Sequence, residues 1–258
     1  MKKLIVLYML SLITFGCEKQ VKSVHHVLKI NGRLGQLEIK NSEDYYRAKA
    51  FVLGKFSYKG DIKFTKVKSI HSAKTLYLDN EVYDAFTKMF EAAKKANVSL
   101  KIISGTRNFD EQKAIWERKW NAYSNLEPIE RSKKILEFSS MPSTSRHHWG
   151  TDMDLNSLNN SYFSSGEGQY EYNWLTNNAN KFGFYQTYTT KENGRKGYNL
   201  EKWHWSYLPL ASQYLKFYNY NISYVDINGF TGDTLAIPNK MITHYVNGLS
   251  KKVIEYNK

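Results

Sequence analysis

The clearest periodic pattern of the chain lies between Asn80 and Asn97. Apolar side chains recur there every three or four positions, and lysines and acids fill the positions between them. The apolar positions are Val82, Ala85, Phe86, Met89, Ala92, Ala93 and Ala96. This spacing predicts an amphipathic helix, which Asn80 can cap and Asn97 can end.

The segments around this helix show both strand and helix patterns. Residues 98–105 alternate between apolar and polar positions, which predicts a strand that leads into the stretch SGTRNFDEQ. A second helix is expected from about residue 110 to 123, with Ile115 and Trp116 facing inward. Residues 151–156 and 201–207 have the alternation of further strands.

Several polar runs predict surface loops. They are NSEDYY (41–46), RSKK (131–134) and LNSLNNSYFSSGEGQ (155–169). Residues 172–185 predict a helix that Gly183 closes, followed by a short strand. From Pro209 onward we expect mixed short elements, with a last helix near residues 239–249. No internal repeat is present.

The first residues have the pattern of an export signal. Lys2 and Lys3 precede an almost wholly apolar run over residues 4–15, and a small residue stands before Cys17. The run resembles a bacterial lipoprotein signal, with residues 1–16 removed and Cys17 lipid-modified, although simple secretion stays open. Cys17 is the only cysteine, so a disulfide framework and a cysteine-based metal site are excluded. We therefore expect an anchor at Cys17 in the bacterial cell envelope, facing the periplasm or the exterior.

Domain organisation and charge follow from the same reading. We expect a tether and N-terminal annex over residues 17–75, with brief strands in VLKING and RLGQLEI (27–39), a main domain over 76–210, and a packed extension over 211–258. The net charge of +13 favours anionic partners. An exported chain rarely meets nucleic acid, so none is expected. An anionic wall or lipid surface and an ordinary basic solvated surface both stay possible.

Two short stretches carry the residues that suggest chemistry. In the strand predicted over 151–156, alternation puts Asp152 and Asp154 on the same face, where two carboxylates repel unless a cation or proton lies between them. His147 lies just upstream, and Glu201 and His204 lie three residues apart further on. Two histidines and one carboxylate with a spare glutamate form a recurring set for catalytic zinc, in which water takes the open position.

These stretches, with two others, resemble the VanY-type zinc D-alanyl-D-alanine carboxypeptidases. Residues 145–154 (SRHHWGTDMD) resemble the family's Ser-x-His-x-x-Gly-x-Ala-x-Asp motif, and residues 201–204 (EKWH) resemble its Glu-x-x-His motif. SGTRNFDEQ resembles the family's Ser-Gly-Tyr-Arg segment, and WLTNNANKFGF resembles its helix that leads to Gly-Phe. The four blocks occur in order and cover about half of the chain.

The resemblance implies a role for each matching position. His147, Asp154 and His204 would bind one zinc ion, and Glu201 would be the catalytic base. Arg107, Gln112 and Ser145 would contact the substrate, with Arg107 also counted among the catalytic residues. Two positions depart from the family pattern, because Asp152 replaces a small residue and Ser206 replaces an arginine found in many members.

Other readings of these residues stay open. We expect Asp152 to accept a hydrogen bond from a ligating imidazole, but it could replace Asp154 as the ligand. His148 lies outside the ligand spacing and is expected to have a structural role. Arg107 suits a carboxylate or a polarised carbonyl but could be a plain surface arginine. The tryptophans near the motifs (149, 203, 205) are expected in the core or the cleft wall.

The resemblance also implies the fold and the reaction. The expected fold is α+β, with a small central antiparallel sheet flanked by helices and the zinc site on the sheet face. The expected reaction is hydrolysis of a D-Ala-terminated peptidoglycan stem peptide by a D-alanyl-D-alanine carboxypeptidase. The alternatives are an L,D-carboxypeptidase or endopeptidase of the same family, or a wall-binding lipoprotein that has lost turnover.

Overall fold

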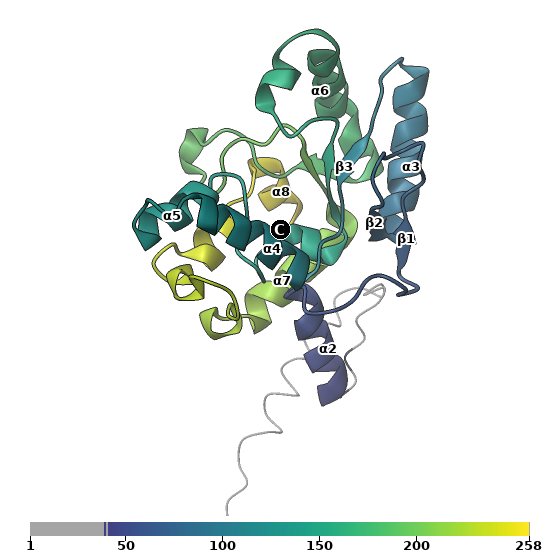
Figure 1. Cartoon of the computed structure of the whole chain (residues 1–258). Helices are drawn as coiled ribbons and strands as arrows, with labels where there is room; N and C mark the ends of the chain where they lie inside the picture. The colour runs from purple at the N-terminus through teal and green to yellow at the C-terminus, as the bar shows by residue number, and fades with distance from the viewer. Residues whose placement is uncertain (1–38, 40, 258) are drawn as a thin grey trace, which may run out of the picture. The chain divides into compact units, whose positions relative to one another are not determined.

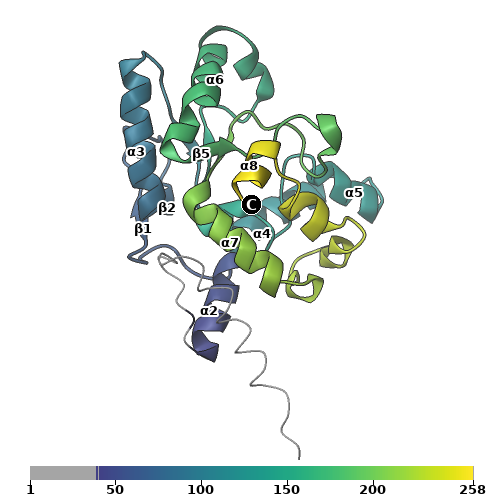
Figure 2. The same cartoon turned by 180° about the vertical axis from the view of Figure 1, so that it is seen from behind.

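The computed structural model of the chain describes residue 39 and residues 41–257 (Figure 1 and Figure 2). Contacts divide the chain into one unit of residues 1–48 and a second of residues 49–258, and helix α2 (Ser42–Val52) runs across the boundary. The signal, Cys17 and nearly all of the strands expected over 27–39 lie outside the described residues, so those expectations stay predictions. Among the described helices, none combines the length and the apolar character that crossing a bilayer requires.

A four-stranded antiparallel sheet forms the centre of the second unit. Its strands lie in the order β3-β4-β6-β5. Their bounds are Ile102–Ser104 for β3, Asp152–Leu155 for β4, His204–Tyr207 for β6 and Phe184–Gln186 for β5. All four residues of β4 are buried, so both faces of this central strand are covered. The predicted α+β class with a small antiparallel sheet is confirmed.

The predicted amphipathic helix is present as α3 (Asn80–Lys95) and packs with a hairpin of strands β1 (Phe64–Lys66) and β2 (Tyr77–Asp79) (Figure 1). Phe86 and Met89 of its apolar stripe are fully buried. The expected cap was wrong by one residue, because the Asp79 carboxylate, and not Asn80, accepts from the backbone N–H of Glu81. Asp79 ends β2, so one residue closes the strand and opens the helix.

Helix α4 (Phe109–Ala122) confirms the second predicted helix and lies beside the candidate site. Asn108 and Glu111 form a capping box at its start, in which each side chain accepts from the other's backbone N–H. Trp116 is fully buried, and its indole Nε1 donates to Thr231 O at 2.8 Å. The tail therefore packs against the centre of α4.

Three helices were missed by the pattern analysis. NSEDYY was wrongly expected as a loop and opens α2, and RSKK lies inside α5 (Pro128–Ile135). The tail, where mixed short elements and a last helix near residues 239–249 were expected, begins with α7 (Leu208–Asn221). In α5 and α7, a proline stands in the first helical turn, where its missing N–H costs nothing.

Two other helix boundaries also differ from expectation. Part of the run expected as a loop over 155–169 belongs to α6 (Gly166–Asn178), which continues as a 3-10 helix to Phe182 and ends at Gly183, with φ of 85°. The last helix expected near 239–249 is instead a π-helix (Met241–Val246), and α8 (Lys251–Tyr256) follows it (Figure 2). Further 3-10 helices are Arg146–Trp149, Asn160–Ser164, Glu192–Gly194, Tyr224–Asp226 and Asp233–Ala236.

Candidate active site

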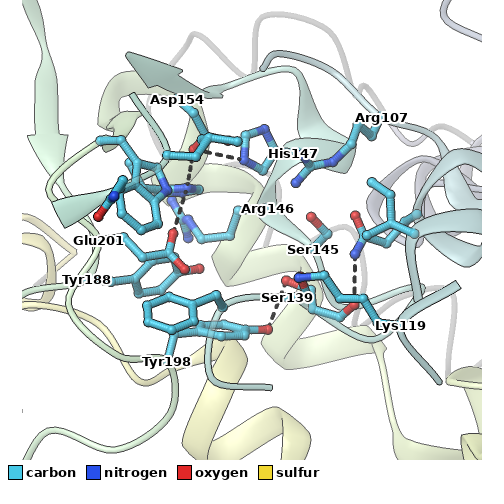
Figure 3. Close-up of a pocket in the computed structure, with 18 of the residues that line it drawn as sticks. Arg107, Lys119, Ser139, Ser145, Arg146, His147, Asp154, Tyr188, Tyr198 and Glu201 are labelled. Atoms are coloured by element: carbon cyan, nitrogen blue, oxygen red, sulfur yellow. Dashed lines mark hydrogen bonds and ion pairs between the residues drawn. The ribbon is translucent and has the colours of Figure 1, made fainter. Parts of the chain in front are cut away.

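Three side chains that can bind a metal ion converge in the second unit. His147, Asp154 and His204 each offer one ligand atom, and these atoms all lie within 4.8 Å of one another. The Asp154 carboxylate lies 3.0 Å from His204 Nδ1 and 3.5 Å from His147 Nε2 (Figure 3). All three residues are buried, so a cation placed among them would be shielded from bulk water.

Local structure explains why residues so far apart in sequence meet. Asp154 on β4 pairs directly with His204 on β6, so the strand register fixes their separation. His147 lies on the 3-10 helix Arg146–Trp149, which Gly150 ends with φ of 73°. A Cβ at Gly150 would also meet the Phe64 ring at 2.6 Å, so only glycine fits this turn into β4.

The outer nitrogen of each histidine has its own acceptor. His147 Nδ1 donates to Gly105 O at 2.9 Å, which leaves the Nε2 lone pair toward Asp154. His204 Nε2 lies 3.0 Å from Asp152 Oδ1, which leaves Nδ1 toward Asp154. Metal-binding histidines usually have such acceptors, which fix the tautomer and the ring orientation. The donor set and its support therefore fit a metal ion.

Asp152 is the centre of a buried network on the outer side of His204. Arg146 Nε donates to Asp152 Oδ1 at 3.0 Å, and the hydroxyls of Thr151 and Ser206 donate to Oδ2 at 2.6 and 3.0 Å. Burial opposes ionisation of Asp152, but Arg146 and His204 hold its pKa well below its usual range. This geometry places Asp152 where an acceptor for an imidazole N–H was expected.

Arg146 is a residue that the sequence analysis missed. It is 2 % exposed, stacks on the Trp149 ring at 4.8 Å and donates from Nη2 to Ser206 Oγ at 2.7 Å. Ser206, noted as a departure from the family pattern, thus binds both partners of a buried ion pair. The negative charge that Asp152 adds beside His204 is neutralised by Arg146.

Glu201 lies beside the three converging residues. It is 5 % exposed, and its Oε2 is 3.6 Å from His204 Nδ1. Burial raises the pKa of Glu201 to about 8, an effect that His204 partly offsets. A carboxyl group in this position can exchange a proton with a molecule bound next to the three converging residues.

The expected substrate contacts all line the same cavity, which has a volume of about 580 Å³. Arg107 Nη1 donates to Ser104 Oγ at 2.7 Å, and Gln112 Nε2 donates to Ser140 O at 2.8 Å. Arg107 Nε, Gln112 Oε1 and Ser145 Oγ are buried and make no hydrogen bond among the described residues. Buried polar atoms left in this state suit a site that binds a polar ligand.

His148 and the tryptophans have the structural surroundings expected for them. His148 Nδ1 donates to Arg107 O at 2.7 Å, and its Nε2 accepts from Ser143 N. Burial lowers the pKa of His148 to about 3, so this ring stays neutral. Trp149 is buried and donates to Val52 O at 3.1 Å, whereas Trp203 lines the cavity.

The cavity wall on the side of α4 was also missed. Arg118 and Lys119 from α4 line it together with Phe138, Ser139 and Ser140 from the segment after α5. Tyr188 and Tyr198 complete the wall opposite (Figure 3). The spacing of Lys119 seven residues after Gln112, two helical turns along one face, is the pattern that could have identified it.

Comparisons with known proteins agree with this geometry. The family model described as VanY, D-alanyl-D-alanine carboxypeptidase, matches residues 75–210, more than half of the chain. The putative carboxypeptidase YodJ of Bacillus subtilis (strain 168) is 30% identical over 154 residues, which are 57% of this chain and 51% of YodJ. A D-alanyl-D-alanine carboxypeptidase of Enterococcus faecalis (strain ATCC 700802 / V583) is 26% identical over 137 residues, 52% of this chain and 50% of that protein.

This chain therefore spans about half the length of these two curated relatives. The solved structure of the LdcB LD-carboxypeptidase matches with a TM-score of 0.50 and 22% identity. The match covers 74% of this chain and 81% of that one, which shows a shared fold.

Proposed function

We propose that this chain, which belongs to the VanY D-alanyl-D-alanine carboxypeptidase family, is a zinc metallopeptidase that trims the D-Ala-terminated stem peptide of peptidoglycan. The observation that carries this proposal is the convergence of His147, Asp154 and His204 next to Glu201 in one cavity. Two imidazoles and one carboxylate suit zinc, and three protein ligands leave a position open for catalysis.

Different residues of the site have different roles in the proposed hydrolysis of the peptide bond. His147, Asp154 and His204 would hold a zinc ion, which when bound would supply Lewis acidity toward the scissile carbonyl and a water molecule. Glu201 accepts a proton from the attacking water and returns it to the leaving amine. Arg107, with its buried and unpartnered Nε, binds a carboxylate or the developing negative charge of the carbonyl oxygen.

Asp152 and Gly105 contribute by orientation. Their hydrogen bonds to the outer nitrogens of His204 and His147 hold the two rings in position. Such bonds fix the tautomer and the ring orientation that a metal-binding histidine needs.

We further propose that Cys17 anchors the protein to a membrane of the bacterial envelope, which would hold it close to the cell wall. The basic net charge of the chain fits a wall-facing position. Fractionation of cells that express the wild-type protein or Cys17→Ser tests this part. The wild-type protein should sediment with membranes, and the variant should not. Equal membrane association of both would contradict the anchor.

The reaction is tested by incubating the full chain with defined muropeptides and measuring the masses of the products by mass spectrometry. We expect loss of one alanine from a pentapeptide, inhibition by a chelator and recovery when zinc is added. Loss of alanine only from a tetrapeptide would instead identify an L,D-carboxypeptidase, and cleavage of a crosslinked dimer an endopeptidase. Stoichiometric zinc binding without any product would overturn the proposed reaction and favour the non-catalytic alternative.

A further inference from the structure

The cavity has a second polar end, formed by Arg118 and Lys119 of α4 together with Ser139. Lys119 Nζ donates to Ser139 Oγ at 2.5 Å, and on the same helix face Gln112 donates to the neighbouring Ser140 O. Tyr198 OH donates to Ser140 Oγ at 2.9 Å from the other side. Ser139 thus holds the ammonium of Lys119 at the cavity wall (Figure 3), and the bonds from Gln112 and Tyr198 hold the neighbouring Ser140.

Positive and negative side chains are distributed unevenly along the cavity. Its carboxylates are Asp154 and Glu201, and both lie at the metal-binding end. Within the part of the chain that the structure describes, no carboxylate oxygen lies within 4.0 Å of Arg118 or Lys119. Burial lowers the pKa of Lys119, the charges of Arg118 and Arg107 lower it further, and the charge of Glu201 offsets part of this effect. This end therefore carries more positive than negative charge. A substrate that binds Arg107 through its terminal carboxylate alone would leave the charge of Lys119 without a counter-ion.

Helix geometry gives the spacing of Gln112 and Lys119 along α4. Gln112 and Lys119 are seven residues apart, which is about 10 Å along an α-helix. An extended peptide covers that distance in about three residues. A ligand that places one carboxylate near Arg107 and Gln112 can therefore place a second near Lys119 a few residues away.

We propose that Lys119, held by Ser139, binds a second carboxylate of the substrate, carried by a dicarboxylic residue of the stem peptide a few residues from the terminal one. This inference rests on the proposed function and names its substrate class. Stem peptides offer two sources of such a group, the free carboxylate of glutamate and that of a diamino dicarboxylic acid. The two share the chemistry that an ammonium and a hydroxyl recognise.

The test uses four stem pentapeptides, in which the glutamate carboxylate and the diamino acid carboxylate are each free or amidated. For the wild-type chain, kcat/KM should be about tenfold higher for the free form at one of the two positions, the size of one partly buried charge-assisted hydrogen bond. In Lys119→Met that ratio should fall to about one, mainly through KM. In Lys119→Arg part of it should return. Lys113→Met, a lysine of the same helix that pairs weakly with Glu117 at 4.0 Å, is the matched control and should keep the wild-type ratio.

A wild-type ratio near one at both positions, or a ratio that Lys119→Met leaves unchanged, would overturn the inference. The same four peptides are also titrated calorimetrically into zinc-loaded Glu201→Gln, with and without Lys119→Met. This measures the preference as a ratio of Kd values, so it is obtained even if no peptide is hydrolysed. Absence of hydrolysis with a Lys119-dependent binding preference would reject the proposed function alone.

Discussion

The two ends of the cavity are built in different ways. At the metal-binding end, paired strand residues and a 3-10 helix supply the side chains, and each outer imidazole nitrogen is held by a hydrogen bond. At the α4 end, one helix face and one loop segment supply them, and Lys119 is half-buried with a single neutral partner. The hydrogen bonds at the first end fix the orientation of both imidazoles, which suits chemistry that tolerates little displacement. The second can vary its side chains without disturbing the sheet, so specificity can change there while the reaction is kept.

Glu201→Gln should have the largest effect of the substitutions considered. The amide keeps the shape of the carboxyl group but cannot accept a proton, so kcat should fall by about 10²–10⁴-fold. Zinc content, measured by atomic emission after gel filtration, should stay at one ion per chain. Retention of wild-type kcat would show that another group is the base.

Asp154→Asn and Asp152→Asn test which of the two carboxylates binds the metal ion and which one only orients His204. Asp154 faces His147 Nε2 and His204 Nδ1, the two nitrogens proposed to bind zinc. Its loss should therefore abolish stoichiometric zinc binding. Asp152 holds only the outer nitrogen of His204, so its loss should weaken zinc affinity by about 10–100-fold. Competition with a coloured chelator measures both values. Complete loss of zinc in Asp152→Asn alone would reverse the assignment of the two carboxylates.

Arg146→Met tests whether the metal-binding end depends on its buried ion pair. The substitution leaves the Asp152 carboxylate buried without its cation, which should lower the free energy of unfolding by about 3–5 kcal/mol. Chemical denaturation of the metal-free protein measures this change. The double variant Arg146→Met/Asp152→Asn should recover part of the loss, because no uncompensated charge is left. A single variant as stable as the wild-type protein would mean that the pair contributes nothing to the fold.

Tyr198→Phe should have the smallest effect, at the α4 end. It removes the hydrogen bond to Ser140 Oγ, which is worth about 1 kcal/mol, so KM for a stem pentapeptide should rise by about fivefold or less. Steady-state kinetics should show kcat within about twofold of wild type. A loss comparable with that of Glu201→Gln would contradict the distinction between the two ends.

Much of the metal-binding end could be predicted from sequence, because its residues stand in short motifs. Alternation over 151–156 put Asp152 and Asp154 on one face, and both carboxylates do contact His204. The catalytic, ligand and substrate roles stay predictions until they are tested. Arg146 was missed because its role depends on the pairing of Asp152 with Ser206 in neighbouring strands. These residues lie 54 positions apart, and no local sequence pattern predicts a strand register over that separation.

The rest of the fold was predicted unevenly for physical reasons. Helices α3 and α4 each have an apolar stripe on the face that is buried, and both helices were predicted. Helix α5 has only eight residues, too few to show a clear helical repeat, and in α7 polar and aromatic side chains are mixed around the helix. In both, the proline in the first turn was the better indicator. Lys119 resembled the exposed lysines of α4, and only the packing of the segment after α5 makes it a cavity residue.

The contact between Gly54 and His148 sets a limit on how short a working fragment can be. A Cβ at Gly54 would come within 2.4 Å of the His148 ring, and Gly54 O accepts from the first N–H of α4 at 2.7 Å. Val52 O holds the Trp149 indole. These partners precede residue 75, where the family match begins. A polypeptide cut to the matched span would lack the backbone that braces the histidine-bearing turn, so its boundaries should be drawn from the packing and not from the alignment.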